Sequence, residues 1–337
     1  MSGSANTPLI DVEDLGIRLK TSRGAAQAVR KVSFSLRRGE TLGLVGESGC
    51  GKSLTALALM GLLPESAVIS GSIRLDGSEL VGLADADYCR LRGNRISMIF
   101  QEPMTALNPM HTVGRQVAEP LRRHKNLSAA DARKEAIALL DRVGLPDAAK
   151  RVDAYPHQFS GGQRQRITIA MALACQPDVL IADEPTTALD VTIQGQILDL
   201  IADLVAERGM AMILISHDLG VIAENVQRMM VMYGGTVVES GPTTDVFARM
   251  GHPYTQGLFR ARPRLGARKG TRLNTIAGTV PELADLPEGC AFADRCTIVE
   301  SRCRMGLPAA VEVRAGHHVR CLRTDVAIAD SVGILGK

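Results

Sequence analysis

The sequence lacks three features that would tie a protein to a membrane or a nucleic acid: a long apolar run, a basic leader and an excess of one charge. Its 337 residues contain no stretch of about 18 apolar residues, so no membrane-spanning helix is predicted. Residues 1–14 have neither the basic head nor the apolar core of a signal peptide. The 39 basic and 36 acidic residues leave a net charge of +3, which does not favour nucleic acid or an acidic substrate. We therefore expect a protein on the cytosolic side that binds no nucleic acid.

Paired Cys-x2-Cys knuckles are also missing, although the chain has seven cysteines. Cys50, Cys89 and Cys175 are scattered, and we interpret them as buried or incidental thiols. The other four crowd toward the C-terminus: Cys290, Cys296, Cys303 and Cys321. In a reducing compartment such a cluster predicts a metal site rather than disulfides.

The length predicts about two domains. Near residue 240 the sequence changes character, because prolines become frequent and the apolar periodicity weakens. We predict a main domain over 1–240, with a helical subdomain at about 104–160, and an accessory domain with the four cysteines over 241–337. A basic run from Arg260 to Arg272 is interpreted as a solvated linker, with a nucleic-acid or lipid contact as the alternative.

A glycine-rich segment joins a predicted strand at 41–45 to a predicted helix at 54–63. It is Gly46, Glu47, Ser48, Gly49, Cys50, Gly51, Lys52 and Ser53, a match to the G-x-x-x-x-G-K-S pattern. Its backbone N–H groups and the helix N-terminus would hold an anion. Lys52 can reach the outer phosphates, and the Ser53 hydroxyl can ligate Mg²⁺. The segment therefore predicts that the chain binds a nucleoside triphosphate.

Predicted strands at 95–100, 179–185 and 210–215 alternate with helical segments, which predicts an α/β fold with a mainly parallel sheet. Two further predicted strands, an edge strand at 9–18 and one at 28–36, come before the loop. Ligands of such sheets gather at the carboxyl ends of the strands. Polar side chains at or just after the ends of the predicted strands and of the loop are Ser53, Gln101, Asp183, Glu184 and His217.

These side chains have distinct predicted roles. Asp183, after a buried strand, would hold Mg²⁺, together with Ser53 and Gln101. Glu184 would be the general base that takes a proton from the attacking water, a contribution of about 10²–10⁴ in rate. Gln101 and His217 would hydrogen-bond that water or the γ-phosphate.

A second anion site is predicted at Ser160, Gly161, Gly162 and Gln163. Ser160 is a good N-cap for the helix that follows, and the glycines leave backbone N–H groups bare. One γ-phosphate cannot easily sit on two helix N-termini of the same subunit. We therefore expect two subunits to pair head to tail, each offering this helix to the nucleotide of the other.

Over about residues 9–245 these motifs resemble the ATP-binding subunits of ABC transporters. By resemblance, 46–53 is the Walker A motif, 160–163 the signature, and 179–184 Walker B with its catalytic glutamate. Ala188-Leu189-Asp190 matches the D-loop, Gln101 the Q-loop and His217 the switch histidine. The resemblance implies a P-loop ABC cassette with an antiparallel β subdomain, two ATP molecules with Mg²⁺ between two subunits, and a permease contact beside Gln101. The family's usual adenine-stacking aromatic is absent, and Leu19 is the nearest counterpart.

The segments 101–109 and 252–255 and the cysteine tail are similar to the dipeptide/oligopeptide (and nickel) importer branch, in particular its longer D-type ATPase subunit. The resemblance implies a heterodimer with a second related ATPase, two permease subunits and an extracytoplasmic substrate-binding protein. It also implies a peripheral position on the cytoplasmic face of the bacterial inner membrane. Nickel chelates, glutathione and opines stay open as solutes. A soluble ATPase acting on nucleic acid is a further alternative, disfavoured because the chain has one signature and no sustained heptads.

In related subunits of this branch the tail cysteines hold a 4Fe–4S cluster. The resemblance therefore implies such a cluster on Cys290, Cys296, Cys303 and Cys321. Zinc and unligated thiols remain as alternatives, because thiolates serve both metals.

Overall fold

The computed structural model describes residues 7–187, 189–261 and 275–335, and the chain divides into two compact units. The first comprises Met1–Leu9, Arg37–Glu40 and Gly82–Leu214. The second comprises Ile10–Leu36, Thr41–Val81 and Ile215–Lys337. Most of the basic run that was interpreted as a linker, from Arg262 to Arg272, lies outside the described residues.

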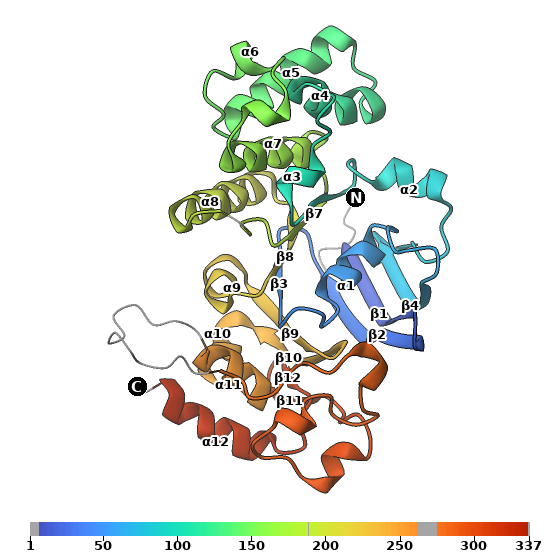
Figure 1. The fold of residues 1–337 in the computed structure, drawn as a ribbon, viewed down its shortest axis with the longest axis vertical. Helices are drawn as coiled ribbons and strands as arrows, with labels where there is room; N and C mark the ends of the chain where they lie inside the picture. Colours follow the sequence, from blue (N-terminus) through green and yellow to red (C-terminus); the bar gives the residue numbers. More distant parts are fainter. Residues whose placement is uncertain (1–6, 188, 262–274, 336–337) are drawn as a thin grey trace. The chain divides into compact units, whose positions relative to one another are not determined.

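Helices dominate the first unit. They are α2 (Asp85–Leu91), α3 (Pro103–Ala106), α4 (Val113–His124), α5 (Ala129–Arg142), α6 (Ala148–Arg151), η1 (Pro156–Gln158), α7 (Gly161–Leu173) and α8 (Val191–Arg208). In α4, Val113, Val117 and Leu121 recur every fourth residue and are buried, and the helix packs on α5 and α7. Figure 1 shows α4 to α7 as one helical layer. Helices thus make up most of residues 104–160, while the bounds of the helical subdomain stay a prediction.

Three adjacent strands lie in the first unit in the order β8 (Ala211–Ser216), β7 (Val179–Asp183) and β6 (Ile96–Ile99), and β8 belongs to this unit as far as Leu214. β6 and β7 are parallel, with Ile99 opposite Ala182. Every residue of these two strands is buried, as expected for strands covered on both faces. Because the strands run in the same direction, the residues that follow them leave the sheet at the same edge.

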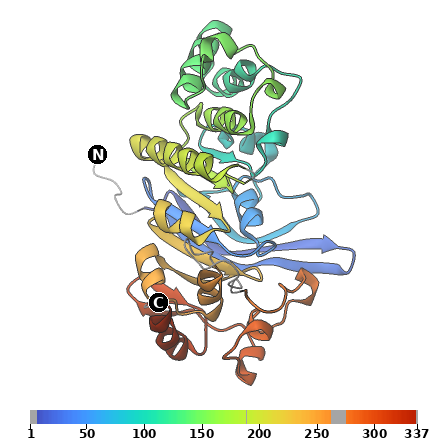
Figure 2. The same ribbon diagram turned by 60° about the vertical axis from the view of Figure 1, so that its left-hand side comes forward.

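The second unit contains an antiparallel sheet in the order β2 (Gly24–Leu36), β1 (Ile10–Thr21), β4 (Val68–Leu75) and β5 (Ser78–Glu79). Figure 2 shows β1 and β2 as a long paired ribbon. The predicted edge position of the strand at 9–18 is wrong, because β1 pairs with β2 on one side and β4 on the other. Register shifts along both ladders break the simple alternation of its side chains.

A second group of strands in this unit has the order β11 (Val311–Arg314), β12 (His317–Val319), β10 (Thr236–Pro242), β9 (Arg228–Tyr233) and β3 (Thr41–Val45). β3 and β9 are parallel and the other pairs are antiparallel. The unit's helices are α1 (Lys52–Leu59), α9 (Leu219–Asn225), α10 (Thr243–Ala248), α11 (Pro253–Arg260), η2 (Leu283–Asp285), η3 (Ala293–Arg295), η4 (Ser301–Arg304) and α12 (Thr324–Leu335).

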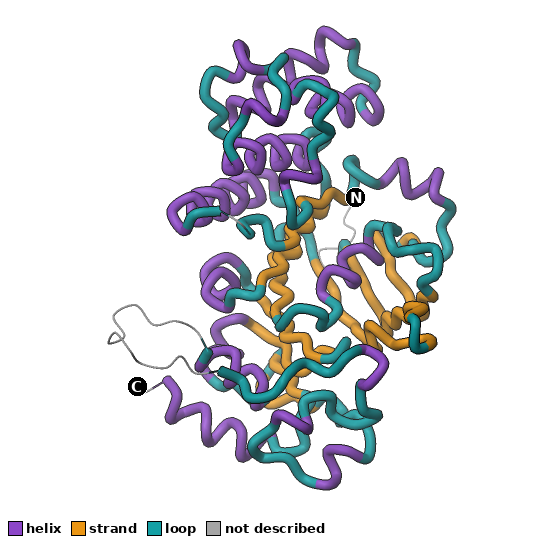
Figure 3. The backbone as a smooth tube through the Cα atoms, viewed as in Figure 1, coloured by secondary structure: helices purple, strands orange, loops and turns teal. Residues whose placement is uncertain are grey.

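The stretch between residue 275 and β11 is mostly loop with short helical turns (Figure 3). Within the described ranges, no helix of either unit has both the length and the apolar character needed to cross a bilayer.

Candidate active site

The predicted phosphate-binding loop lies between β3 and α1 in the second unit. Gly46 and Gly51 have φ of 155° and 103°, which L side chains rarely adopt. A Cβ on Gly46 would also stand 2.2 Å from the Met232 carbonyl oxygen. Lys52 is 6% exposed, and its Nζ donates to the carbonyl oxygens of Gly46 (2.7 Å) and Glu47 (3.1 Å). The loop thus combines a backbone cradle with a buried cation, as phosphate binding requires.

The remaining loop residues differ in exposure. Ser48, Gly49 and Ser53 are exposed, and Ser53 lies in the first turn of α1. Cys50 is buried, and this burial raises the pKa of its thiol although the Lys52 ammonium opposes the shift. Cys50 is therefore a buried, protonated thiol within the loop, in line with the interpretation of the scattered cysteines as buried thiols.

Glu184 lies at the carboxyl end of β7 in the first unit and has a φ of 46°, an uncommon value for a residue with a side chain. Its Oε2 accepts hydrogen bonds from Gln101 Nε2 (3.2 Å) and from Thr187 Oγ1 (2.9 Å). The β6–β7 register explains the first contact, because Gln101 and Glu184 each stand two residues beyond the paired Ile99 and Ala182. Asp183, one residue earlier, is 5% exposed. Two carboxylates therefore lie at this edge of the sheet: the half-buried Glu184, oriented by two hydrogen-bond donors, and the buried Asp183 beside it.

The predicted second anion site is the N-terminus of α7. Ser160 Oγ accepts from the Gln163 N–H (3.4 Å), and Gln163 Oε1 accepts from the Ser160 N–H (3.3 Å). This reciprocal capping box fixes the first turn. Ser160 and Gly161 are exposed, while an added Cβ on Gly162 would stand 3.1 Å from Ile193 Cγ2. The helix predicted to follow Ser160 is confirmed, and its first turn is open to solvent.

Asp190 and His217 are both exposed at the surface of their units. Asp190 precedes α8 in the first unit, and Ala188, two residues earlier, lies outside the described residues. His217 follows β8 and belongs to the second unit. The structure thus brings Gln101 and Glu184 together, while the phosphate-binding loop and His217 belong to the other unit. The use of all these residues in one site stays a prediction.

Two family models match the chain. One, "ABC transporter", matches residues 29–187, and the other, "Oligopeptide/dipeptide transporter, C-terminal region", matches residues 238–303. A putative peptide import ATP-binding protein of Brucella abortus is 51% identical over 94% of this chain and 97% of its own length. The chain belongs to the ABC transporter family of ATP-binding proteins. It is therefore an ATPase subunit that works with ATP and Mg²⁺.

Other relatives agree with this membership. The dipeptide transport ATP-binding protein DppD of Bacillus subtilis is 49% identical over 94% of this chain and 95% of its own length. Among solved structures, a dimeric ATP-binding cassette in a post-hydrolysis state bound to ADP and Pi has a TM-score of 0.63 and 27% identity, covering 69% of this chain and 98% of the cassette. The predicted resemblance to ABC transporter ATPases and the predicted α/β fold class are confirmed.

Two residues that no sequence pattern predicted, Tyr254 and Arg295, contact the Walker A loop of this ABC subunit. Tyr254, in α11, is fully buried, and its hydroxyl accepts from the Glu47 N–H (2.7 Å). Arg295, in η3, pairs with both oxygens of the Glu47 carboxylate (2.7 and 3.1 Å). Burial raises the pKa of the Tyr254 phenol, so the group stays protonated. No sequence signal marks these contacts, because 207 and 248 residues separate the partners.

The four C-terminal cysteines line one pocket, together with His252 and Phe292. Burial raises the pKa of Cys290 and of Cys296, and that of Cys321 to about 11. The Cys290 N–H donates to the Cys303 carbonyl (2.8 Å), which links the first and the third of the four cysteines. No group of three or more His, Cys, Asp or Glu side chains in the described part of the chain is arranged to hold a metal ion. The donor set, four sulfurs in one pocket, nevertheless fits the chemistry of an iron–sulfur cluster or zinc.

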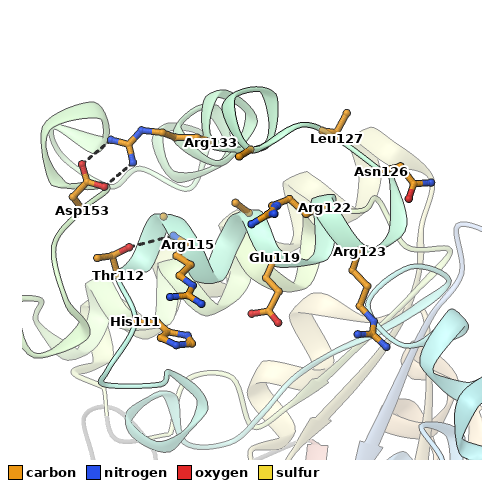
Figure 4. Close-up of a pocket in the computed structure, with 13 residues that line it drawn as sticks. His111, Thr112, Arg115, Glu119, Arg122, Arg123, Asn126, Leu127, Arg133 and Asp153 are labelled. Carbon is orange, nitrogen blue, oxygen red and sulfur yellow. Dashed lines mark hydrogen bonds and ion pairs between the residues drawn. The ribbon is translucent and has the colours of Figure 1, made fainter.

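A separate polar pocket of about 740 Å³ lies in the helical layer of the first unit (Figure 4). Arg115, Glu119 and Arg123 line it at four-residue spacing along α4, and Figure 4 shows all three on one side of the helix. Across the pocket, both oxygens of Asp153 accept from Arg133 at 2.6 Å. With Arg122 and His111 also in its lining, the pocket carries an excess of basic groups.

Proposed function

We propose that this chain is the energy-coupling ATPase of an importer for dipeptides or oligopeptides. The peptide assignment is supported by the printed names of relatives that match over nearly their whole length, and by the match to the oligopeptide/dipeptide C-terminal region. The observation that carries the enzymatic role is the Glu184 carboxylate, oriented by Gln101 and Thr187 at the end of β7. Binding of nucleic acid is not part of this function.

In this proposal the Walker A backbone and Lys52 bind the β- and γ-phosphates. Ser53, Gln101 and Asp183 would hold Mg²⁺, whose preferred ligands are such oxygens and which would offset the phosphate charge. Glu184 accepts a proton from a water whose oxygen bonds to the γ-phosphorus. The bond from that phosphorus to the β–γ bridging oxygen breaks and leaves ADP and inorganic phosphate. His217 would donate a hydrogen bond to the γ-phosphate.

We further propose that the exposed first turn of α7, from Ser160 to Gln163, completes the nucleotide site of a second, related ATPase subunit, with Asp190 at the same interface. The solvent-open capping box and bare N–H groups support this role. The similar solved cassette is itself a dimer. Two subunits with distinct sequences would then form a heterodimer with two nucleotide sites.

The other proposed partners are two permease subunits and an extracytoplasmic substrate-binding protein, with the chain peripheral on the cytoplasmic face of the inner membrane. Besides the permease contact expected beside Gln101, we propose a further one at the basic pocket of α4, whose charge suits a segment that carries acidic residues. Substitution Arg115→Glu should release the chain from membranes that contain the permeases, while Lys150→Ala, an exposed change on α6, should not. Equal membrane retention of both variants would remove this pocket from the interface.

We also propose a 4Fe–4S cluster on Cys290, Cys296, Cys303 and Cys321, with zinc as the alternative. Its support is the convergence of the four thiols on one pocket. Anaerobic purification with assays of iron, sulfide and zinc tests it. Cys303→Ser should lose the metal, whereas Cys175→Ser, at another buried cysteine, should keep it. A metal-free wild-type chain would leave the four cysteines as unligated thiols.

The substrate is tested with the assembled transporter in proteoliposomes. Labelled dipeptides and longer peptides should accumulate when ATP is present, and Lys52→Ala should reduce uptake to background. Lys150→Ala serves as the matched control. Uptake of a nickel chelate, glutathione or an opine in place of peptides would keep the ATPase role and overturn the peptide assignment.

A further inference from the structure

The Walker A loop of this chain carries an acidic side chain where it is expected to hold a polyanion. Glu47 is the first variable residue of the loop, and its side chain is 30% exposed. A carboxylate close to a triphosphate repels it, because both are negatively charged. The repulsion is strongest where solvent and salt screen the charges only partly. Something must therefore offset the Glu47 charge if the loop is to bind ATP well.

Arg295 supplies that charge from the C-terminal region. Its side chain is 5% exposed, and its guanidinium forms a bidentate ion pair with the Glu47 carboxylate. The same group donates to the Tyr233 hydroxyl (3.2 Å) and to the carbonyls of Ile276 (3.2 Å) and Ala277 (2.8 Å). These five hydrogen bonds equal the number of N–H donors of a guanidinium. Arg295 is thus fixed in one position, and its two parallel hydrogen bonds to Glu47 (the bidentate pair) fix the orientation of the carboxylate as well.

Tyr254 fixes the backbone of the same loop residue. Its hydroxyl accepts from the Glu47 N–H, and its ring packs against Tyr233 (centroids 4.6 Å apart) and Phe292 (5.4 Å). Phe292 precedes Arg295 in the chain and lines the cysteine pocket. The C-terminal region therefore contacts both the side chain and the main chain of Glu47.

We propose that Arg295 and Tyr254 are positioning residues for nucleotide binding: Arg295 neutralises Glu47, and Tyr254 holds the loop in its phosphate-binding shape. The affinity of the Walker A loop for ATP then depends on a segment that the ATPase core does not contain. The inference rests on the proposed binding of ATP by this loop, and on no assumption about metal or transported solute.

The test measures the Kd for ATP by calorimetry, with the full-length chain in a Glu184→Gln background that prevents turnover. Arg295→Ala should raise Kd about tenfold, equivalent to about 1.4 kcal/mol, and added salt should shrink this difference because the cause is charge. In the double variant Glu47→Gln/Arg295→Ala the Kd should return to within about threefold of the parent, since the uncompensated carboxylate is gone. Tyr254→Phe should raise Kd independently of salt.

Arg23→Ala is the matched control. Arg23 joins the β1–β2 turn to the same C-terminal region through Asp285 (2.7 Å) and Glu282 (3.3 Å), without touching the loop. It should leave Kd unchanged. If Arg23→Ala weakens ATP binding as much as Arg295→Ala does, the Arg295–Glu47 ion pair only tethers the C-terminal region to the ATPase core, and the proposal is wrong.

An unchanged Kd in Arg295→Ala, or the same loss in the single and double variants, would also overturn the proposal. Should Arg295→Ala fail to fold, Arg295→Lys replaces it, because it keeps the charge and loses the bidentate grip. The Kd of Arg295→Lys for ATP should lie between those of the parent and of Arg295→Ala. A Kd equal to that of the parent would contradict the role of the bidentate hydrogen bonds to Glu47. A parent chain that binds no ATP at all would instead refute the proposed nucleotide site.

Discussion

Removal of the Thr187 hydroxyl should slow ATP hydrolysis without weakening ATP binding. Thr187 Oγ1 donates to Glu184 Oε2 at 2.9 Å, shorter than the 3.2 Å bond from Gln101. Thr187→Val keeps the shape of the side chain and removes this donor. A hydrogen bond to a charged group contributes about 1.5–3 kcal/mol. Because Glu184 is only half-buried, we take the lower end, which corresponds to about a tenfold fall in kcat.

The assay is phosphate release by the assembled transporter over a range of ATP concentrations, with Kd measured separately. Thr186→Val, at the preceding position, is the matched control and should change kcat less than twofold. In a Glu184→Gln background Thr187→Val should have no further effect, since the group it orients is gone. A normal kcat in Thr187→Val, or a rise in the Kd for ATP by the same factor, would refute the role of Thr187 in orienting the base.

Three further predictions follow from single contacts. Gly46→Ala should abolish ATP binding, measured by calorimetry, because its Cβ would stand 2.2 Å from the Met232 carbonyl oxygen. Gly49→Ala is the control: its Cβ meets no atom within 4 Å, so it should bind ATP more strongly than Gly46→Ala. The reverse order of affinities would contradict the steric reasoning. Two variants, Ser160→Ala and Ser128→Ala, each remove a serine N-cap and should each lower the free energy of unfolding by about 1 kcal/mol, measured with denaturant. Only Ser160→Ala should also slow ATP hydrolysis, by about tenfold or more. Equal ATPase activities of the two variants would show that α7 does not complete the partner's nucleotide site. Burial raises the pKa of Asp178, but hydrogen bonds from Arg38 and Arg95 outweigh this effect and hold the pKa below its usual value. The stability that these bonds contribute should therefore be lost as the pH drops below about 4. The melting temperature of Asp178→Asn should fall less over this pH range than that of the wild type.

Local motifs made much of the site predictable from sequence. The geometry of the phosphate-binding loop, of the two carboxylates at the end of β7 and of the Ser160 cap depends on residues that are close in sequence, so a local pattern is enough to predict it. The parallel pairing of β6 and β7 could also be expected from the alternation of strands and helices. It is this pairing that brings Gln101 to Glu184.

Contacts between distant residues could not be predicted in the same way. The hydrogen bond from Glu47 to Tyr254 and the ion pair with Arg295 depend on how the C-terminal region packs, which no pattern near residue 47 encodes. The central position of β1 was hidden because register shifts interrupt its alternation, and one strand does not reveal how many neighbours it has. Thr187 lies in a turn beyond Walker B, where hydrogen-bonding side chains are common and carry no distinctive spacing.

Single-turnover hydrolysis by Glu184→Gln in the assembled transporter tests whether Glu184 is the general base. The variant should bind ATP with its normal Kd and convert it to ADP at least about a hundredfold more slowly. Glu207→Gln, an exposed glutamate paired with Arg142 on the same unit, should hydrolyse ATP at the normal rate. ADP formation by Glu184→Gln at the wild-type rate would show that the carboxylate held by Gln101 and Thr187 does not take the proton.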